Sequence, residues 1–588
     1  MAQRPEGNGR GFCDILTWNS RMTQPYAISL EFPSKFTTRE LLSGMQNHAT
    51  GPMPYSVREP SSMSSESLLP PGAHNDTDVF AVHGADPEVL AYAMAKYSRS
   101  ALSMRESLTE ISAQRAEQFL NTFYFQYGHR SIADLAHIAF AVERLSLLAA
   151  IVLVDEQRWD GQERSTRYQN FLKSGWFFPD FGQDTTSAEL YSKTIVNLFD
   201  TYQRTTAAVH EALRRRVACP ESLKPDAYER TLKARAFDVA RYLLPLATNT
   251  SLGQIVNART LETQVSRLLS SPIAEVRDLG LKLREAATGP AWQINAQSAA
   301  AFVQKLDPTL AAEATQLFIR EVRTAPTLVK YAEPNQYLIQ SRDELAQAAA
   351  ELLAAHPIDP APVVDLVERT ETLEVELAAT LLYSAAHHPY RQIRDLVATL
   401  PEARINEIIE LGLRHRGRHD EALRAFHAGA ALRFDILMDI GGFRDMHRHR
   451  RVTQIIQGFT GMHGYETPTN GDLAPGVDLL AEAGILGDYR AAIESAYAAS
   501  AKIASSGAPE ATHSALYLLP LATRIRSLFK MDFAEAQYIS ELRSGPAGHF
   551  SYRRIAWEMF LAVERQHPSL AKHIRVTDFT EPIDLLKR

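Results

Sequence analysis

The sequence predicts a fold of the α/β class, of α+β type, built from two tandem, diverged copies of one domain behind a flexible leader. Two observations carry this prediction: one seven-residue segment occurs twice, and apolar alternation typical of strands stands beside long helical patterns. At 588 residues the chain is too long for a single hydrophobic core. We therefore expect a leader at 1–76, a first domain at 77–320 and a second domain at 321–588.

The composition restricts the class of protein. Hydrophobic residues make up 45% and charged residues 22%, which is enough apolar material for large cores. The formal charge of -7 gives no basic field that would hold nucleic acid or an anionic membrane. Cys13 and Cys219 are the only cysteines, which excludes a disulfide framework and a thiolate zinc site. The longest apolar run, Leu145–Val154, is shorter than the roughly 20 residues that span a bilayer, so we expect a cytoplasmic protein.

The leader is rich in Ser, Pro, Gly and Asn, a composition that predicts a flexible segment and indicates no function. Ordered structure is expected from a short strand at Asp78–Val82, followed by a helix that begins at Asp86-Pro87-Glu88. A second strand is expected at Ile138–Leu148, because apolar residues alternate there before the apolar run.

The repeated segment is the strongest internal signal. Tyr242–Thr248 and Tyr517–Thr523 are identical, at an offset of 275 (517 − 242). A weaker match pairs Gly128-His129 with Arg418-His419, which precedes a strand pattern at Phe426–Met438. The period far exceeds the roughly 20 to 50 residues of solenoid repeats, so the pattern indicates a domain duplication.

A first candidate site lies in the loop that carries Glu163, Ser165 and Arg167 at alternate positions. In an extended segment these side chains project to one side. A carboxylate, a hydroxyl and a guanidinium together suit a planar base or a phosphate. The alternative is an ordinary solvated charged loop.

A second group of cations follows. Arg241 precedes the repeated Leu-Leu-Pro, and Asn257-Ala258-Arg259 and Arg267 stand on the next helical pattern. Arginine is preferred for dianions because its planar fork binds phosphate in a bidentate way. The alternative is local ion pairing, of Arg259 with Glu262 and of Arg267 with Glu275.

The second copy carries the densest basic run, Arg444–Arg451. Helical spacing would place Arg444, Arg448 and Arg451 on one face, where they need an anionic partner. A salt-bridge cluster with Asp439 and Asp445 is the alternative. The run's two histidines lack the carboxylate spacing of a metal site, and the acidity of the chain disfavours RNA binding.

Together these segments resemble the flavin-dependent thymidylate synthases, whose hallmark is Arg-His-Arg followed by a spaced Ser-x-Arg-Tyr. The first copy matches at Gly128-His129-Arg130-Ser131, at Glu163-x-Ser165-x-Arg167-Tyr168, at Arg241 and at Asn257-Ala258-Arg259, but has Asp155-Glu156-Gln157 where Arg-His-Arg is expected. The second copy keeps Arg448-His449-Arg450 and departs elsewhere, at Gly458, Thr460, Leu516 and Asp532-Phe533-Ala534. The hallmark is therefore split between the copies.

The resemblance implies, for each copy, a mainly antiparallel sheet packed with long helices. It implies an FAD-dependent methyltransferase that moves a one-carbon unit from methylenetetrahydrofolate to dUMP or a related uridine nucleotide, with NADPH as reductant. Glu163, Ser165 and Arg167 would then bind the nucleotide, Arg241 its phosphate, and Arg267 would polarise the base. The expected flavin-binding residues are His129, Ser131, Asn257, Arg259, Arg448, His449 and Arg450.

Members of this family are homotetramers, so the resemblance implies that a duplicated chain forms a homodimer that mimics the tetramer. We expect the Ser-x-Arg loop of the first copy and the Arg-His-Arg of the second to complement each other across an internal pseudo-twofold axis. The alternative function is a non-catalytic nucleotide- or flavin-binding scaffold, which the acidic Asp155-Glu156-Gln157 favours.

Overall fold

The computed structural model describes residues 84–96, 130–330, 332–417, 420–468, 478–581 and 584–586. The predicted leader, the predicted strand at Asp78–Val82 and His129 lie outside these residues. Both copies belong to one compact unit that begins at Val82. Within the described ranges no helix is sufficiently long and apolar to cross a membrane.

The first copy contains a three-stranded antiparallel sheet in the order β1-β3-β2. Its strands are β1 (His137–Ser146), β2 (Asp160–Glu163) and β3 (Asn249–Asn257). The predicted strand at Ile138–Leu148 is thus confirmed for most of its length. The apolar run after it forms helix α4 (Leu147–Leu153), because Ser146 caps the helix by accepting a hydrogen bond from the Ala149 N–H at 2.9 Å.

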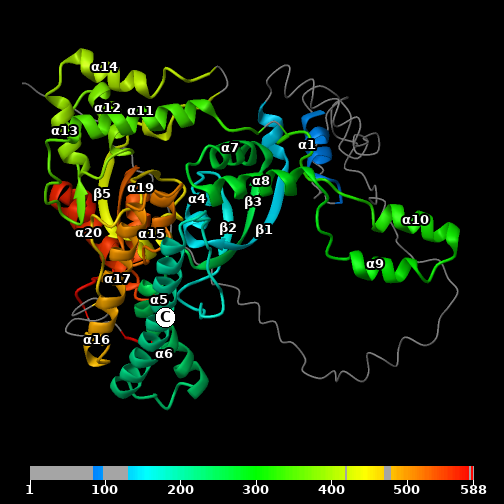
Figure 1. Cartoon of the computed structure of the whole chain (residues 1–588), viewed down its shortest axis with the longest axis horizontal. Helices are drawn as coiled ribbons and strands as arrows, with labels where there is room; N and C mark the ends of the chain where they lie inside the picture. Colours follow the sequence, from blue (N-terminus) through cyan, green and yellow to red (C-terminus); the bar gives the residue numbers. More distant parts are fainter. Residues whose placement is uncertain are drawn as a thin grey trace, which may run out of the picture. The chain divides into compact units, whose positions relative to one another are not determined.

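Helices α4 and α7 pack against this sheet, and α7 and α8 pack against each other beside it (Figure 1). The pair α9 and α10 follows α8. The helical elements of this half are α1 (Pro87–Lys96), η3 (Arg130–Leu135), α5 (Thr185–Arg216), α6 (Pro225–Ala240), η4 (Arg241–Leu243), α7 (Ala258–Leu269), α8 (Ala274–Thr288), α9 (Ala296–Val303) and α10 (Pro308–Phe318).

The second copy contains a four-stranded antiparallel sheet in the order β4-β5-β7-β6. Its strands are β4 (Val364–Leu366), β5 (Leu432–Asp439), β6 (Thr453–Ile456) and β7 (Arg524–Met531). The strand predicted at Phe426–Met438 was placed too early, because a 3₁₀ turn, η5 (Arg424–Phe426), precedes β5. The antiparallel α+β fold expected for both copies is confirmed.

The helices of the second copy precede and follow its strands. They are α11 (Gln336–Leu353), α12 (Leu373–Tyr383), α13 (Tyr390–Ala398), α14 (Glu402–Leu411), α15 (Ile440–Met446), α16 (Leu479–Glu482), α17 (Leu486–Ala504), α18 (Ala511–Leu516), α19 (Phe533–Ser544), α20 (Phe550–Gln566) and α21 (Pro568–Ala571).

The two copies of the repeated segment lie side by side. Tyr242–Thr248 and Tyr517–Thr523 run antiparallel, with Pro245 opposite Pro520. Four backbone hydrogen bonds of 2.9 to 3.1 Å join them. A segment that pairs with its own repeat in this way lies on an approximate twofold axis, as in an isologous dimer interface. The identical residues therefore mark the axis that relates the copies.

Matching hydrogen bonds fix which positions correspond. The Leu147 N–H donates to the Thr248 carbonyl at 2.9 Å, and the Ile440 N–H donates to the Thr523 carbonyl at the same distance. The strand-to-helix units therefore align at an offset of 293 (440 − 147). After β2 the Arg164 N–H donates to the Ser251 carbonyl, and after β6 the Gln457 N–H donates to the Arg526 carbonyl. Arg164 and Gln457 therefore correspond, again at an offset of 293 (457 − 164). Gly458 and Thr460 accordingly stand where the first copy has Ser165 and Arg167.

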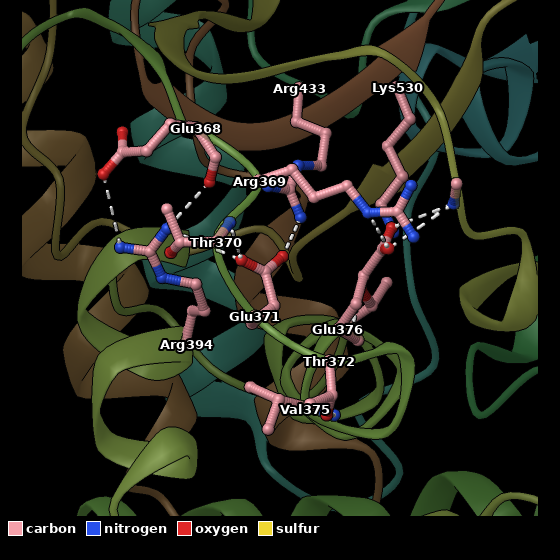
Figure 2. A network of polar contacts seen from close by, with 12 residues as sticks. Glu368, Arg369, Thr370, Glu371, Thr372, Val375, Glu376, Arg394, Arg433 and Lys530 are labelled. Carbon is pink, nitrogen blue, oxygen red and sulfur yellow. Dashed lines mark hydrogen bonds and ion pairs between the residues drawn. The ribbon is translucent and has the colours of Figure 1, made fainter.

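A buried charge network anchors α12 to the second sheet (Figure 2). Arg433 on β5 lies directly opposite Lys530 on β7. The Lys530 ammonium donates to Glu376 at 3.0 Å, and Arg433 forms an ion pair with Glu371 just before α12. Because each buried cation has its own carboxylate, both charges remain in the interior.

Candidate functional site

The Ser-x-Arg loop of the first copy reaches the second copy. Arg167 is buried, and its Nε donates to Asp238 Oδ1 at 2.8 Å. Its Nη1 donates to the Tyr552 hydroxyl on α20 at 2.7 Å. Burial opposes the charge of Arg167, but the Asp238 carboxylate raises the pKa of the guanidinium above its usual value. Ser165 supports the loop by accepting a hydrogen bond from the Arg167 N–H at 3.2 Å.

Arg241 also lies between the copies. It is only 1% exposed, and its Nη1 lies 3.4 Å from Asp445 Oδ2 in the second copy. Its Nε and Nη2 are buried and have no hydrogen-bond partner among the residues that the structure describes. A Cβ at Gly441 would stand 3.4 Å from each of these nitrogens, in ordinary van der Waals contact, so Gly441 packs against the guanidinium. Unsatisfied buried donors on a cation are costly, and an anion is the partner that relieves this cost.

Asp439 and Ser551 of the second copy form a hydrogen-bonded pair close to Arg241. Asp439 caps α15 by accepting from the Gly442 N–H at 2.6 Å, and the Ser551 hydroxyl donates to its other oxygen. Burial raises the pKa of Asp439 to about 6, against the opposing effects of Arg241 and Ser551. A side chain at Gly442 would overlap the Ser551 hydroxyl, so the position requires glycine.

A cavity of about 20 Å³, which has room for about one water molecule, adjoins Asp439 and Ser551. Residues of both copies line it: Tyr242, Val363, Leu437, Met438, Asp439, Glu466, Pro468, Phe550, Ser551, Arg554 and Ile555.

Glu163 and the basic run of the second copy meet directly. Glu163, at the end of β2, forms an ion pair with Arg444 of α15, and both side chains are nearly buried. The Arg450 guanidinium lies over the ring of Trp159, 5.0 Å from its centroid. The carboxylate predicted to contact the nucleotide is therefore neutralised by the other copy.

The Arg-His-Arg segment is not helical. The predicted shared face of Arg444, Arg448 and Arg451 was wrong, because α15 ends at Met446 before the chain turns into β6. Arg448 is exposed. His449 is buried and accepts a hydrogen bond from Arg543 Nε at 2.8 Å. Burial lowers the pKa of His449 to about 3, with the nearby cations acting in the same direction.

The acidic residues of the first copy take partners that are distant in sequence. Glu156 binds Arg267, with nitrogen–oxygen distances of 2.9 and 2.7 Å, so the predicted pairing of Arg267 with Glu275 was wrong. Asp155 binds Arg424 of the second copy at 2.5 Å. Burial would raise the pKa of Asp155, but Arg424 and neighbouring cations hold it below its usual range.

The beginning of α7 forms a separate group. Asn257 caps this helix by accepting from the Thr260 N–H at 2.8 Å. Arg259 lies 3.2 Å from Asp134 and 3.5 Å from Glu421, so the predicted pairing with Glu262 was also wrong. Side-chain geometry at Ser131 lies outside the part of the chain that the structure describes.

The structure thus brings Glu163, Ser165, Arg167 and Arg241 to the boundary with the second copy. Arg259 also reaches the second copy, through Glu421, but from the beginning of α7, where Asn257 caps the helix. Sequence reasoning missed the residues that the second copy contributes, namely Asp439, Gly441, Gly442, Ser551 and Tyr552. The sequence signal that could have found them is the pair Gly441-Gly442, because the aligned positions of the first copy hold the larger residues Leu148 and Ala149.

Comparison with known proteins agrees with the duplication. The family model described as "Thymidylate synthase complementing protein" matches residues 81–289 and again residues 365–569. A UPF0159 protein of Chlamydia muridarum is 27% identical over 541 residues, covering 86% of this chain and 93% of the relative.

Two further matches are shorter. A flavin-dependent thymidylate synthase of Clostridium tetani is 24% identical over 177 residues, covering 30% of this chain and 67% of the relative. The crystal structure of flavin-dependent thymidylate synthase ThyX from Helicobacter pylori, complexed with FAD and dUMP, aligns at 16% identity with a TM-score of 0.23, over 34% of this chain and 89% of that chain.

The two matched regions together make up more than half of the chain; the first contains the whole three-stranded sheet and the second contains the four-stranded sheet except Val364. The chain is therefore a tandem, two-copy member of the thymidylate synthase complementing family, the flavin-dependent thymidylate synthases.

Proposed function

We propose that the protein is an FAD-dependent methyltransferase that acts on dUMP or a related uridine nucleotide. Methylenetetrahydrofolate supplies the one-carbon unit and NADPH the reducing equivalents. The observation that carries this proposal is Arg241, a buried guanidinium with two nitrogens that have no hydrogen-bond partner in the described part of the chain. A nucleotide phosphate supplies the acceptor oxygens that such a fork binds.

We propose that the surrounding residues bind the rest of the same nucleotide. Arg241 holds the phosphate, and the loop of Glu163, Ser165 and Arg167 forms the wall beside it. Tyr552 and Asp238 fix the Arg167 guanidinium through hydrogen bonds of 2.7 and 2.8 Å, so its orientation is set before a ligand arrives. The proposed site is therefore composite, with walls from both copies.

The flavin residues are proposed from the family pattern. The exposed Arg448 leaves its guanidinium accessible to flavin phosphates, and His449 and Arg450 follow it in the chain. His129, Ser131, Asn257 and Arg259 complete the proposed set. When bound, reduced FAD carries the one-carbon unit and the electrons, while the chain's own residues bind and orient the reactants.

Arg267 is proposed to polarise the base. A fixed cation near the pyrimidine oxygen stabilises the negative charge that makes C5 nucleophilic. In the structure Arg267 also hydrogen-bonds the Val152 carbonyl at 3.0 Å, which holds its guanidinium in one place beside Glu156. We further propose that two chains associate into a homodimer and that the protein is cytoplasmic.

The test is the visible spectrum of the purified protein with added FAD and NADPH, followed by an assay that adds dUMP and methylenetetrahydrofolate. We expect a bound flavin that NADPH bleaches, and release of the C5 hydrogen of dUMP. Arg448→Ala is expected to abolish FAD binding without unfolding the protein, because Arg448 is exposed. The control is Arg215→Ala, an equally exposed arginine in the last turn of α5, which should bind FAD normally.

One alternative function is favoured by a specific observation. Several of the proposed site arginines already pair with carboxylates, as Arg167 does with Asp238 and Arg267 with Glu156. A non-catalytic nucleotide-binding scaffold would tolerate such closed pairs. A colourless protein that takes up no FAD but binds dUMP would establish this alternative and overturn the methyltransferase proposal.

A further inference from the structure

We infer that each chain holds one nucleotide-phosphate site, not two, and that it lies where Arg241 faces Gly441. The pseudo-symmetric position, where Leu516 stands in place of Arg241, is a structural lock that binds no ligand. This inference rests on the proposed function, because it takes a nucleotide phosphate as the ligand of Arg241. A duplicated domain with a twofold axis would otherwise offer two equivalent sites.

The axis through Pro245 and Pro520 generates two junctions between the copies. We call the first the arginine junction, and it contains Arg241, Tyr242, Asp439, Gly441 and Ser551. We call the second the tyrosine junction, and it contains the equivalent residues Leu516, Tyr517, Ser146, Leu148 and Glu275. Glu275 and Ser551 correspond because each is the second residue of its helix, α8 and α20.

The arginine junction retains what an anion requires. The two free guanidinium nitrogens of Arg241 face a glycine, and the neighbouring Gly442 brings the backbone close to Ser551. Glycine allows a backbone to approach a ligand closely. A cavity with room for about one water molecule lies beside Asp439 and Ser551.

The tyrosine junction has lost each of these features. Leu516 replaces the guanidinium, and Leu148, which is fully buried, replaces the glycine. Neither leucine offers a donor to a phosphate. An anion brought to this position would lose its hydration without compensation.

At the tyrosine junction a hydrogen-bonded cluster of Glu275, Ser146 and Tyr517, which we call the carboxylate lock, replaces the anion site. Glu275 accepts from the Ser146 N–H at 2.9 Å, from the Ser146 hydroxyl at 2.6 Å and from the Tyr517 hydroxyl at 2.8 Å. Tyr517 belongs to the second copy, so this cluster ties the copies together. Relative to the arginine junction, the carboxylate and the serine have exchanged places, since Asp439 aligns with Ser146 and Ser551 with Glu275.

Equilibrium dialysis of the purified full chain with dUMP measures the number of nucleotide sites per chain directly. We expect saturation at one dUMP per chain. Arg241→Leu, which copies the residue of the tyrosine junction, should weaken binding by at least about tenfold. Glu275→Gln and Tyr517→Phe should lower the melting temperature while leaving the affinity for dUMP within about twofold, because they touch only the lock.

Two dUMP molecules per chain would overturn the inference, as would an Arg241→Leu variant that binds one dUMP with the wild-type affinity. If Arg241→Leu fails to fold, Arg241→Lys keeps the positive charge without the planar fork and should retain one weakened site per chain. Unchanged affinity in that folded variant would also overturn the inference.

Thermal unfolding in the presence of inorganic phosphate distinguishes a failure of this inference from a failure of the proposed function. If the wild-type chain binds no dUMP, the proposed function fails. A thermal stabilisation by phosphate that persists in Glu275→Gln but is lost in the Arg241 variant would still place an anion at the arginine junction. Equal stabilisation of both variants would reject that assignment.

Discussion

The strand pairing of the two sheets matches except at a β-bulge in β1, between Glu143 and Leu145, and the sheets differ completely on one face. On the far side of the bulge from α4, β1 and β5 align at an offset of 294 (433 − 139). In the first sheet Ala139 lies opposite Ile255, and Ile255 is 52% exposed. At the aligned positions of the second sheet Arg433 lies opposite Lys530, and both are buried. The apolar pair is thus open and the charged pair is covered, the reverse of the usual preference.

This reversal shows how helices set the chemistry of a duplicated sheet. In the second copy α12 and the segment before it lie over β5 and β7 and provide Glu371 and Glu376, so two adjacent cations become tolerable (Figure 2). Among the described residues of the first copy no such pair of acids reaches Ile255. The difference between the sheets therefore depends on partner carboxylates and not on strand geometry.

The largest effect is expected from breaking the buried pair. Glu376→Ala leaves the Lys530 ammonium without its carboxylate in the interior, at a cost of about 3 to 5 kcal/mol in the free energy of unfolding. Urea denaturation measures the change. The double variant Glu376→Leu with Lys530→Met removes both charges and should recover most of the loss; a single variant that loses less than about 1 kcal/mol would contradict the comparison.

A pH effect of intermediate size is expected from His447, which stands where the first copy has Val154. Burial lowers the pKa of His447 to about 4, although Asp155 and Gln454 favour its charged form. A depressed histidine pKa gives stability that is complete above the unfolded value and is lost as the pH falls from about 6.5 to about 4.

His447→Gln should therefore flatten the fall in unfolding free energy over that pH range, by up to about 3 kcal/mol. Thermal unfolding at a series of pH values measures it. The same substitution at the exposed His573 serves as the control and should leave the profile unchanged. A steeper profile in His447→Gln would be the wrong sign for a buried neutral imidazole.

The smallest effect is expected from copying the charge into the open sheet. Ile255→Lys introduces the residue of the second copy at the aligned, half-exposed position of the first. Because the ammonium remains in water, the free energy of unfolding should change by less than about 0.5 kcal/mol. A loss similar to that of Glu376→Ala would mean that this face of the first sheet is covered in solution.

Much of the architecture could be predicted from local patterns. The exact repeat predicted the duplication, and motif spacing placed Gly458 and Thr460 at the positions that the strand register later assigned to Ser165 and Arg167. The partners of the charged residues could not be predicted. Periodicity identifies neighbours three or four residues apart on a helix. Arg267 instead pairs with Glu156, and Glu163 with Arg444 of the other copy.

Joining the two copies in one polypeptide has a genetic consequence. In a dimer of identical subunits every substitution appears on both sides of the axis, so neither side can change alone. Here the two prolines at the axis are encoded separately, and so are the residues that flank them. Selection can therefore preserve an arginine on one side while a leucine becomes fixed on the other, so that the two junctions evolve independently.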